Sequence, residues 1–387
     1  MRPGTPGFSP HRLKAARQAR GLTGAALAEL VSISRSAISQ YERGIQTPSP
    51  KVVQEIADKL NLPAHYFVTP KESDGQTAVF YRSFSAALKS SRTRLERKLE
   101  WLHEIVFEIE SLIEFPKVNL PSFDLPSDVL NLTDDEIEKL AKQTRRFWNL
   151  GDGPISNLVL LLENNGIVIS RQFLDSMKLD AFSNWNEKTA RPIVVLGTDK
   201  GAAVRSRFDA AHELAHLLLH SKFDEKDLKN AARFKQIERQ ADRFAGAFIL
   251  PATTFLSEVV SFSPEALLGL KKRWGASVGL MAKRSSDLGA IFEEEATRLW
   301  MKISRRGWRK KEPYDDTIEP EEPKLLEKSF RVLIESNTGA RDALMAKLPW
   351  YWRDVEELSS LPSGLLAPTG SKKENFSPRI IKFPQTG

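Results

Sequence analysis

The 387-residue chain contains no cysteine. It can therefore form no disulfide and can offer no thiolate to a metal, which fits the reducing cytoplasm, where we expect the protein to work. Long apolar runs are also missing, because stretches such as residues 158–162 are far shorter than the roughly 20 residues of a membrane-spanning helix. The first residues lack the apolar core of a secretory signal. These absences argue against disulfide-stapled secreted domains and integral membrane proteins.

Histidine is scarce too, yet three of the six histidines fall within residues 212–220. His212 and His216 frame a His-Glu-x-x-His pattern. On a helix, positions i and i+4 lie one turn apart on one face, so both imidazoles can reach a single Zn²⁺, with Glu213 beside the open position of the metal. This layout is typical of metal-dependent hydrolases.

A catalytic zinc needs a third protein ligand, and the next predicted helix, over residues 231–250, offers one. Glu238 and Asp242 share a face of this helix at i, i+4 spacing. A carboxylate there would complete a His₂Glu site, and Asp242 would orient a ligand imidazole from behind. Such pairs are more often solvated, but here they follow the histidines closely and stand between apolar residues. His220, at the end of the metal helix, is predicted to cap the helix or to support a ligand.

The residues also suggest a mechanism. Glu213 would accept a proton from the water that attacks an amide carbonyl and would return it to the departing amine. Zinc is the expected metal, and manganese is the alternative, because two imidazoles and a carboxylate bind both. We place the N-cap of the metal helix at Ser206. Arg205 and Arg207 could stabilise an oxyanion, although solvated arginines are the plainer interpretation.

Residues 9–69 predict a compact helical domain that binds DNA. Thr23 caps one short helix, and Ser34 caps the next, which ends at Gly44. A short helix, a turn and a capped polar helix are the helix-turn-helix plan, whose second helix enters the major groove. The net charge of +7 permits nucleic-acid binding.

The same segment resembles the XRE, or lambda-repressor-like, helix-turn-helix family, in residues 22–30, 34–44 and 48–50. The resemblance implies DNA-contacting residues on the second helix, the first four at or near base edges and the last at a phosphate: Arg35, Ser36, Gln40, Ser39 and Arg43. Gly24 and Ser32 depart from the family pattern, which has glutamine and glycine there. A helical domain that binds protein instead of double-stranded DNA is the alternative.

Residues 148–251 resemble the ImmA/IrrE family of bacterial metallo-endopeptidases. The matching blocks are residues 148–155, 207–220, 238–245 and 248–251. The third block carries a Glu-x-x-Ala-Asp-x-Phe-Ala pattern in which that family's glutamate is the third metal ligand, by match Glu238. The resemblance implies a zincin-like fold and limited proteolysis of a partner repressor.

Between the two domains, residues 78–127 predict a long helical linker, with its helix over residues 84–114. Leucines such as Leu95 and Leu102 repeat every seven residues, and the first half is basic while the second is acidic. The helix could pair two subunits antiparallel in a homodimer, or it could dock on the peptidase domain.

The expected fold is multi-domain and mainly α, with an α+β zincin-like domain over residues 128–260. Its short strands are predicted near residues 166–170, 180–185 and 192–196, and an extended peptide could add to the edge of this sheet. Residues 261–312 predict a helical extension, similar to a second helix-turn-helix. Residues 313–387 predict a helical region with a disordered tail from residue 361.

The sequence thus predicts a cytoplasmic transcription regulator that binds operator DNA and cuts a repressor in a stress-response or phage-derived module. Two alternatives stay open. The zinc domain could sense a metal or a peptide without cutting, or the protein could be an antitoxin whose peptidase-like domain binds a toxin.

Overall fold

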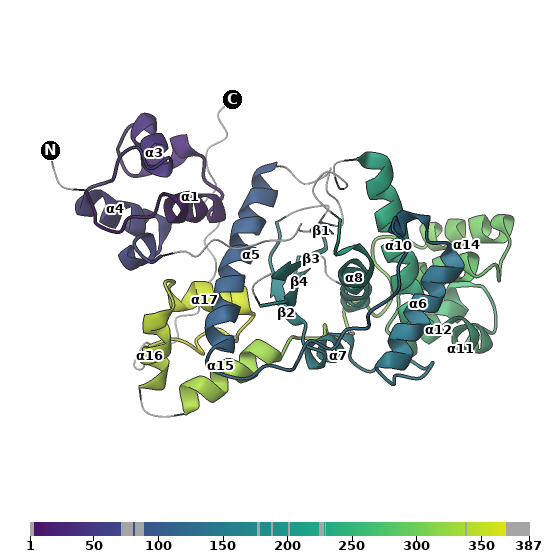
Figure 1. The fold of residues 1–387 in the computed structure, drawn as a ribbon. Coiled ribbons are helices and arrows are strands. Elements are labelled where there is room, and N and C mark those ends of the chain that lie inside the picture. The colour runs from purple at the N-terminus through teal and green to yellow at the C-terminus, as the bar shows by residue number, and fades with distance from the viewer. Residues whose placement is uncertain are drawn as a thin grey trace.

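The computed structural model describes the chain except for ten segments: residues 1–3, 71–79, 82–88, 176–178, 187–188, 200–201, 224–227, 229, 337–338 and 369–387. The fold is multi-domain and mainly helical, with one small sheet in an α+β unit, as the sequence predicts. Figure 1 shows the N-terminal helices as a separate lobe beside the long helix α5, and the sheet between α5 and the helix α8.

The N-terminal lobe is the predicted helix-turn-helix unit. Its elements are α1 (Pro10–Ala19), α2 (Gly24–Leu30), α3 (Arg35–Glu42), α4 (Pro50–Leu60) and the short 3₁₀ helix η1 (Ala64–Phe67). Thr23 Oγ1 and Ser34 Oγ each accept a backbone hydrogen bond of 3.1 Å, which confirms both predicted caps. Ser32 lies between the two capped helices with φ of 53°, a left-handed value that favours glycine. Serine therefore keeps the turn at some cost in strain.

Helix α5 (Lys89–Glu110) follows, and it ends four residues earlier than predicted. The start of the predicted helix and Leu88 lie outside the described residues. Leu95 and Leu102 of the seven-residue stripe are fully buried in a core that also holds residues of the N-terminal lobe and of the sheet. The stripe is covered within its own chain, so the structure agrees with the docked helix and not with pairing of two subunits through this face.

The sheet has four strands in the order β1-β3-β4-β2. Strands β2 (Val168–Gln172), β3 (Ala181–Asn186) and β4 (Arg191–Gly197) match the three predicted runs. β2 pairs with β4 in parallel, and β3 pairs with β4 antiparallel. The sequence did not predict β1 (Phe80–Tyr81), which adds to the outer edge of β3.

Each face of the sheet belongs to a different hydrophobic core. Ile169 and Val194 point into one core with α6 (Asp134–Phe147), α7 (Leu158–Asn164), α8 (Ala203–Ala215) and α10 (Ala231–Ile249). Val168 and Val195, on the other face, join the core that α5 shares with the N-terminal lobe and the C-terminal helices. Alternation along each strand thus connects the sheet to both halves of the molecule.

The remaining helices complete both cores. They are α11 (Ala252–Glu258), α12 (Pro264–Trp274), α13 (Val278–Asp287), α14 (Glu293–Arg305), α15 (Leu325–Glu335), α16 (Ala340–Lys347) and α17 (Trp352–Ser359). Leu366 is fully buried, and its backbone N–H donates to the carboxylate of Glu356. The prediction of a disordered tail is therefore wrong for residues 361–368, because Leu361 and Leu366 have a core to enter. Its remainder lies outside the described residues.

The N-terminal lobe is held against the C-terminal helices by polar and aromatic contacts. Arg20 makes two hydrogen bonds to Asp354, of 2.6 and 2.8 Å. The Trp101 indole of α5 donates to the hydroxyl of Tyr66 (2.9 Å), and the ring of Trp350 lies 6.0 Å from that of Trp101. No described helix combines the length and the apolar character that crossing a lipid bilayer would require.

Candidate metal centre

The metal helix starts earlier than the sequence suggested. Helix α8 begins at Ala203, so the prediction of a cap at Ser206 is wrong; its hydroxyl, inside the helix, accepts instead from Arg171 (3.1 Å). After Ala215 the helix widens into one π-turn, His216–His220. Single π-turns within helices are frequent at functional sites. This one lets His220 turn toward His216.

Two helices bring the three predicted ligands together. The Nε2 atoms of His212 and His216 lie 2.9 Å apart on α8 and its π-turn. Glu238 comes from α10, with its two carboxylate oxygens 3.6 Å from His212 Nε2 and 3.3 Å from His216 Nε2. Both histidines are buried, and the side chain of Glu238 is 17% exposed. Three donors of the types that zinc prefers therefore face one point.

A chain of buried hydrogen bonds fixes how His216 carries its proton. The side-chain N–H of Gln240 donates to the carbonyl of Val129 (2.9 Å), so its oxygen is left to accept from His220 Nε2 (3.1 Å). Neutral His220 then has its lone pair on Nδ1, which lies 3.0 Å from His216 Nδ1. His216 must donate there, and its Nε2 keeps a lone pair for the metal. Burial, the largest influence, holds the pKa of His220 well below its usual range, so the ring is neutral.

Asp242 does the same for the other ligand. Its Oδ1 lies 2.9 Å from His212 Nδ1, so His212 donates there and Nε2 faces His216 and Glu238. Carboxylate and imidazole partners of this kind orient metal ligands from behind. The structure thus brings both predicted supporting residues, Asp242 and His220, against the ligands, although His220 does so through the π-turn and not as a helix cap.

The donor set fits a cation. Burial acts to lower the pKa of His212, but hydrogen bonds and charge from Asp242 and Glu238 outweigh it and raise that pKa to about 10. Burial also opposes the charge on Glu238, yet hydrogen bonds from His212 and His216 lower its pKa to about 2. Both shifts mean that the surroundings favour positive charge between the two imidazoles and the carboxylate, which a divalent ion would supply.

Glu213 lies beside the predicted ligands, and only one of its two carboxylate oxygens accepts a hydrogen bond from a described residue. Its Oε2 accepts from the Ser183 hydroxyl of β3 (2.6 Å), while Oε1 is buried and makes no hydrogen bond to any described residue. The ligand atoms of His212, Glu213 and His216 all lie within 4.8 Å of one another. Burial raises the pKa of Glu213 to about 8, against the lowering effects of His212 and Ser183. A carboxylate in this position can hold or release a proton near neutral pH.

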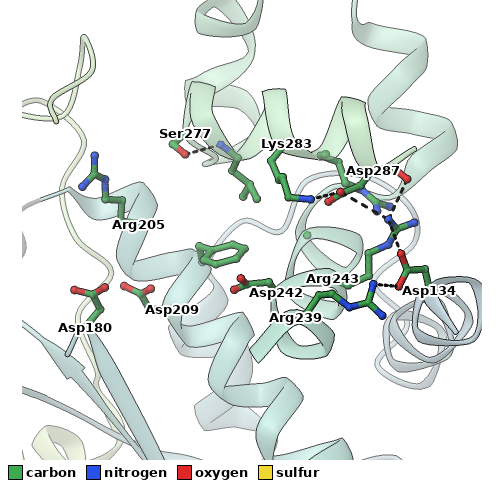
Figure 2. A pocket seen from close by; sticks show the side chains of 14 residues that line it. Asp134, Asp180, Arg205, Asp209, Arg239, Asp242, Arg243, Ser277, Lys283 and Asp287 are labelled. Atoms are coloured by element: carbon green, nitrogen blue, oxygen red, sulfur yellow. Dashed lines mark hydrogen bonds and ion pairs between the residues drawn. The ribbon is translucent and has the colours of Figure 1, made fainter. Parts of the chain in front are cut away.

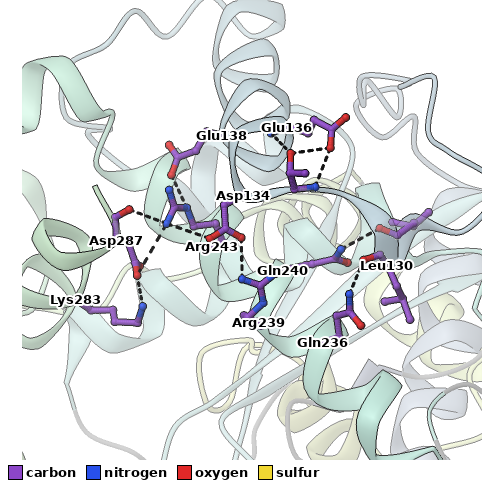
Figure 3. Close-up of polar contacts among 12 residues, drawn as sticks. Leu130, Asp134, Glu136, Glu138, Gln236, Arg239, Gln240, Arg243, Lys283 and Asp287 are labelled. Carbon is purple, nitrogen blue, oxygen red and sulfur yellow. Dashed lines mark hydrogen bonds and ion pairs between the residues drawn. The ribbon is translucent and has the colours of Figure 1, made fainter. Parts of the chain in front are cut away.

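A cavity of about 490 Å³ opens behind His212, between α8, α10 and α13. Asp242 lines it, as does Phe208, whose ring lies 6.2 Å from that of His212 (Figure 2). Arg243, which also lines the cavity, forms an ion pair with Glu138 (2.6 Å) and lies near the carboxylates of Asp134 and Asp287 (Figure 3). This ion-pair network ties α6, α10 and α13 together around the metal centre.

Four of the predicted DNA-contacting residues lie on α3 and Arg43 is its C-cap; the helix is on the side of the N-terminal lobe away from the sheet (Figure 1). Gln40 is half-buried. The other four are exposed: Arg35, Ser36, Ser39 and Arg43. Arg43 Nε donates to the carbonyl of Ser39, one turn back (3.2 Å). Their roles at base edges and phosphates stay predictions.

Comparison with known families agrees with both halves of this description. Residues 13–67 match the model of the helix-turn-helix family, and residues 162–286 match that of the IrrE N-terminal-like domain, a peptidase family. The N-terminal segment belongs to the helix-turn-helix family, and residues 162–286 are similar to the IrrE-like peptidase family. A relative, the uncharacterized HTH-type transcriptional regulator YazB of Bacillus subtilis (strain 168), is 34% identical over 61 residues, which are 16% of this chain and 88% of YazB.

This protein is therefore a helix-turn-helix regulator fused to an IrrE-like peptidase domain. The peptidase match ends at residue 286, inside α13, whereas we predict a domain over residues 128–260; the boundaries stay a prediction. Arg207 is buried and donates to Glu321 and to the carbonyl of Ile155, so the plainer interpretation of it as a solvated arginine is wrong, and its role at an oxyanion stays an untested alternative.

The sequence analysis did not identify two residues of the centre, Ser183 and Gln240. Ser183 stands alone on a strand, and only the folding of β3 onto α8 brings it to Glu213. Gln240 lies between the two noticed carboxylates of α10, two residues from each. Its helical position, a half turn away from Glu238, would have pointed to a different face, and the π-turn brings His220 to it.

Proposed function

We propose that this regulator binds operator DNA through α3 and that its IrrE-like domain is a zinc-dependent endopeptidase. The observation that carries the proposal is the convergence of His212 Nε2, His216 Nε2 and the Glu238 carboxylate, with a free oxygen of Glu213 beside them. Zinc held by these three residues would supply Lewis acidity to the carbonyl under attack. Manganese is the alternative metal.

The residues of the chain divide the remaining work. Glu213 Oε1 would take the proton of the attacking water, and the same oxygen would give it to the departing amine. Ser183 holds Oε2, so the carboxylate cannot rotate away. Asp242 and His220 hold the two imidazoles with their Nε2 lone pairs inward. Hydrolysis of a peptide bond needs each of these functions.

For the substrate we propose a partner repressor in a stress-response or phage-derived module, as the family resemblance implies. DNA contacts from Arg35, Ser36, Ser39, Gln40 and Arg43 would bring the protein to the operator where that repressor binds. We place this activity in the cytoplasm. A homodimer would have to form through a surface other than the covered stripe of α5.

The deciding experiment is the zinc content of the purified protein together with cleavage of co-expressed candidate repressors. We expect one zinc per chain in wild type and in Glu213→Gln, and loss of zinc in Glu238→Ala. Glu265→Ala is the matched control, because this glutamate is exposed and pairs only with Arg306 among the described residues. Cleavage should be lost in both centre variants and kept in the control.

Other outcomes separate the alternatives. A protein that keeps zinc in Glu238→Ala would refute the His₂Glu ligand set. Zinc binding without cleavage, and regulation unchanged in Glu213→Gln, would support a metal- or peptide-sensing transcription factor. Tight binding of a neighbouring gene product without cleavage would support an antitoxin.

A further inference from the structure

Helix α14 carries a groove on a side that the hydrophobic core leaves uncovered. Ala296, Leu299 and Ile303 are buried in that core and hold the helix in place. The groove has a volume of about 660 Å³ and is lined by Thr297, Trp300, Met301, Ser304, Arg305 and Arg309. Most of these residues are three or four positions apart, so they follow one side of the helix.

The floor of the groove is apolar. The Trp300 ring is half-buried, and its edge faces α13 at Gly279, where an added Cβ would lie 3.7 Å from the indole. The side chain of Met301 is 47% exposed. The guanidinium carbon of Arg309 lies 5.1 Å from the centroid of the Trp300 ring, a cation–π contact that keeps this arginine along the groove. Exposed methionine beside an aromatic ring is typical of surfaces that bind peptides.

The rim of the groove is basic. Lys302, Arg305 and Arg309 are exposed, and none of them forms an ion pair within the described part of the chain. Lys302 and Arg305 are three positions apart on α14, so their side chains are neighbours. Arg306 differs from them, since it pairs with Glu265 (2.6 Å). The groove therefore combines an apolar floor with cations that have no ion-pair partner of their own.

This combination favours an acidic polypeptide over a nucleic acid. The first turn of α14 is acidic, and its three side chains are exposed: Glu293, Glu294 and Glu295. A phosphate backbone that followed the helix would meet like charge there. An amphipathic helix would instead place an apolar side chain on Met301 and carboxylates on Arg305 and Arg309, as helices do when they bind in a groove.

We propose that the groove of α14 binds an acidic amphipathic segment of a partner protein. An apolar side chain of that segment packs against Trp300 and Met301, and its carboxylates pair with the basic rim. In Figure 1, α14 lies at the end of the molecule opposite the N-terminal lobe. The groove shares no residue with α3 or with the predicted metal ligands. The inference is therefore independent of whether the domain cuts peptide bonds.

The test uses the full-length chain and a fluorescein-labelled synthetic peptide of about four helical turns, with glutamates on one face and leucines on the other. We expect the peptide to bind wild type in fluorescence anisotropy and to bind Lys302→Glu/Arg305→Glu about tenfold more weakly. Lys302→Arg/Arg305→Lys keeps both charges and should bind like wild type. Met301→Ser should weaken binding about threefold, because apolar contact is lost.

Lys142→Glu/Arg146→Glu is the matched control. Both residues are exposed, they lie one turn apart on α6, and their reversal changes the net charge by the same amount. The control should bind the peptide like wild type. A peptide with glutamine in place of each glutamate should bind wild type about tenfold more weakly than the acidic peptide.

The remaining outcomes overturn the inference. Absence of peptide binding to wild type, equal affinity of wild type and Lys302→Glu/Arg305→Glu, or an equal loss in the α6 control would each do so. A labelled DNA duplex of random sequence should bind the α14 and α6 charge-reversal variants alike. If only the α14 variant lost binding to this duplex while its affinity for the peptide was unchanged, the groove would be a nucleic-acid site instead.

Discussion

Replacing Gln240 by leucine should damage the metal site without touching a ligand. Gln240 accepts from His220 Nε2 and donates to the carbonyl of Val129. Leucine fills the volume but makes neither bond, so the buried His220 N–H loses its partner. The lowest-energy response is for His220 to move its proton to Nδ1, which faces His216. His216 must then carry its own proton on Nε2, where the metal binds.

The size of the effect follows from that exchange. For zinc to bind His216 Nε2 in this variant, His220 would have to carry its proton on Nε2 again, where the acceptor oxygen of Gln240 is gone. An unsatisfied buried donor of this kind costs about 1–3 kcal/mol. That range corresponds to a loss of about 5- to 150-fold in zinc affinity, similar to the 10- to 100-fold typical of groups that support ligands. We expect the apparent Kd for zinc, from competition with a chromophoric chelator, to rise by about this factor in Gln240→Leu.

Gln236→Leu is the matched control. Gln236 stands one turn earlier on α10, and its side chain donates to the carbonyl of Leu130, next to the carbonyl that Gln240 reaches (Figure 3). Within the described part of the chain its side chain makes no hydrogen bond to a histidine, so its loss should lower stability but leave the zinc Kd within about twofold. If both variants bound zinc equally well, the tautomer reasoning for His216 would be refuted.

Three further predictions test other parts of the molecule. Ser183→Ala should keep zinc but raise the pKa of Glu213, because the hydrogen bond from the Ser183 hydroxyl lowers that pKa. The acidic limb of the pH profile of cleavage should therefore move up by about one pH unit. An unchanged limb would contradict the positioning role of Ser183. Zinc must displace a proton from His212, whose pKa is raised to about 10, so the apparent zinc affinity should rise about tenfold per pH unit between pH 7 and 9, and a flat titration would count against this. On a selected operator, Arg35→Ala should cost about 1–3 kcal/mol of binding free energy and relax the base preference. Arg43→Ala should weaken binding to all DNA sequences alike and reduce the salt dependence of binding. Equal loss of specificity in both variants would contradict the assignment of Arg35 to a base and Arg43 to a phosphate.

The local features of the chain were readable because they depend on neighbours in sequence. Thr23 and Ser34 cap their helices through backbone groups three residues on, and the spacing of His212 and His216 needs only a helix. The helix over residues 231–250 was predicted to within one residue of α10, because Pro251 stops it. Capping, periodicity and ligand spacing are properties of one helix, so one sequence suffices.

Other features were missed because their partners are remote in sequence. The predicted cap at Ser206 was wrong because the helix extends back to Ala203, which is buried. The segment after residue 360 has a composition typical of disorder, yet Leu361 and Leu366 are buried in the hydrophobic core shared with the C-terminal helices. No local sequence pattern predicts that burial. Burial overrides composition when a core can accept the side chain.

The sequence by itself was enough to predict His212 and His216 as metal ligands, Glu213 as the base and the helix-turn-helix plan, because each prediction needs only residue type and helical spacing. The family resemblance added Glu238 as the predicted third ligand. Only the tertiary structure decided which groups orient them: Ser183 from the sheet and Gln240 through the π-turn. It also decided that β1 lies on the edge of β3. β1 and β3 are about a hundred residues apart in sequence. Their pairing depends on which sheet edge the folded chain leaves available for another strand, and that is a property of the whole molecule.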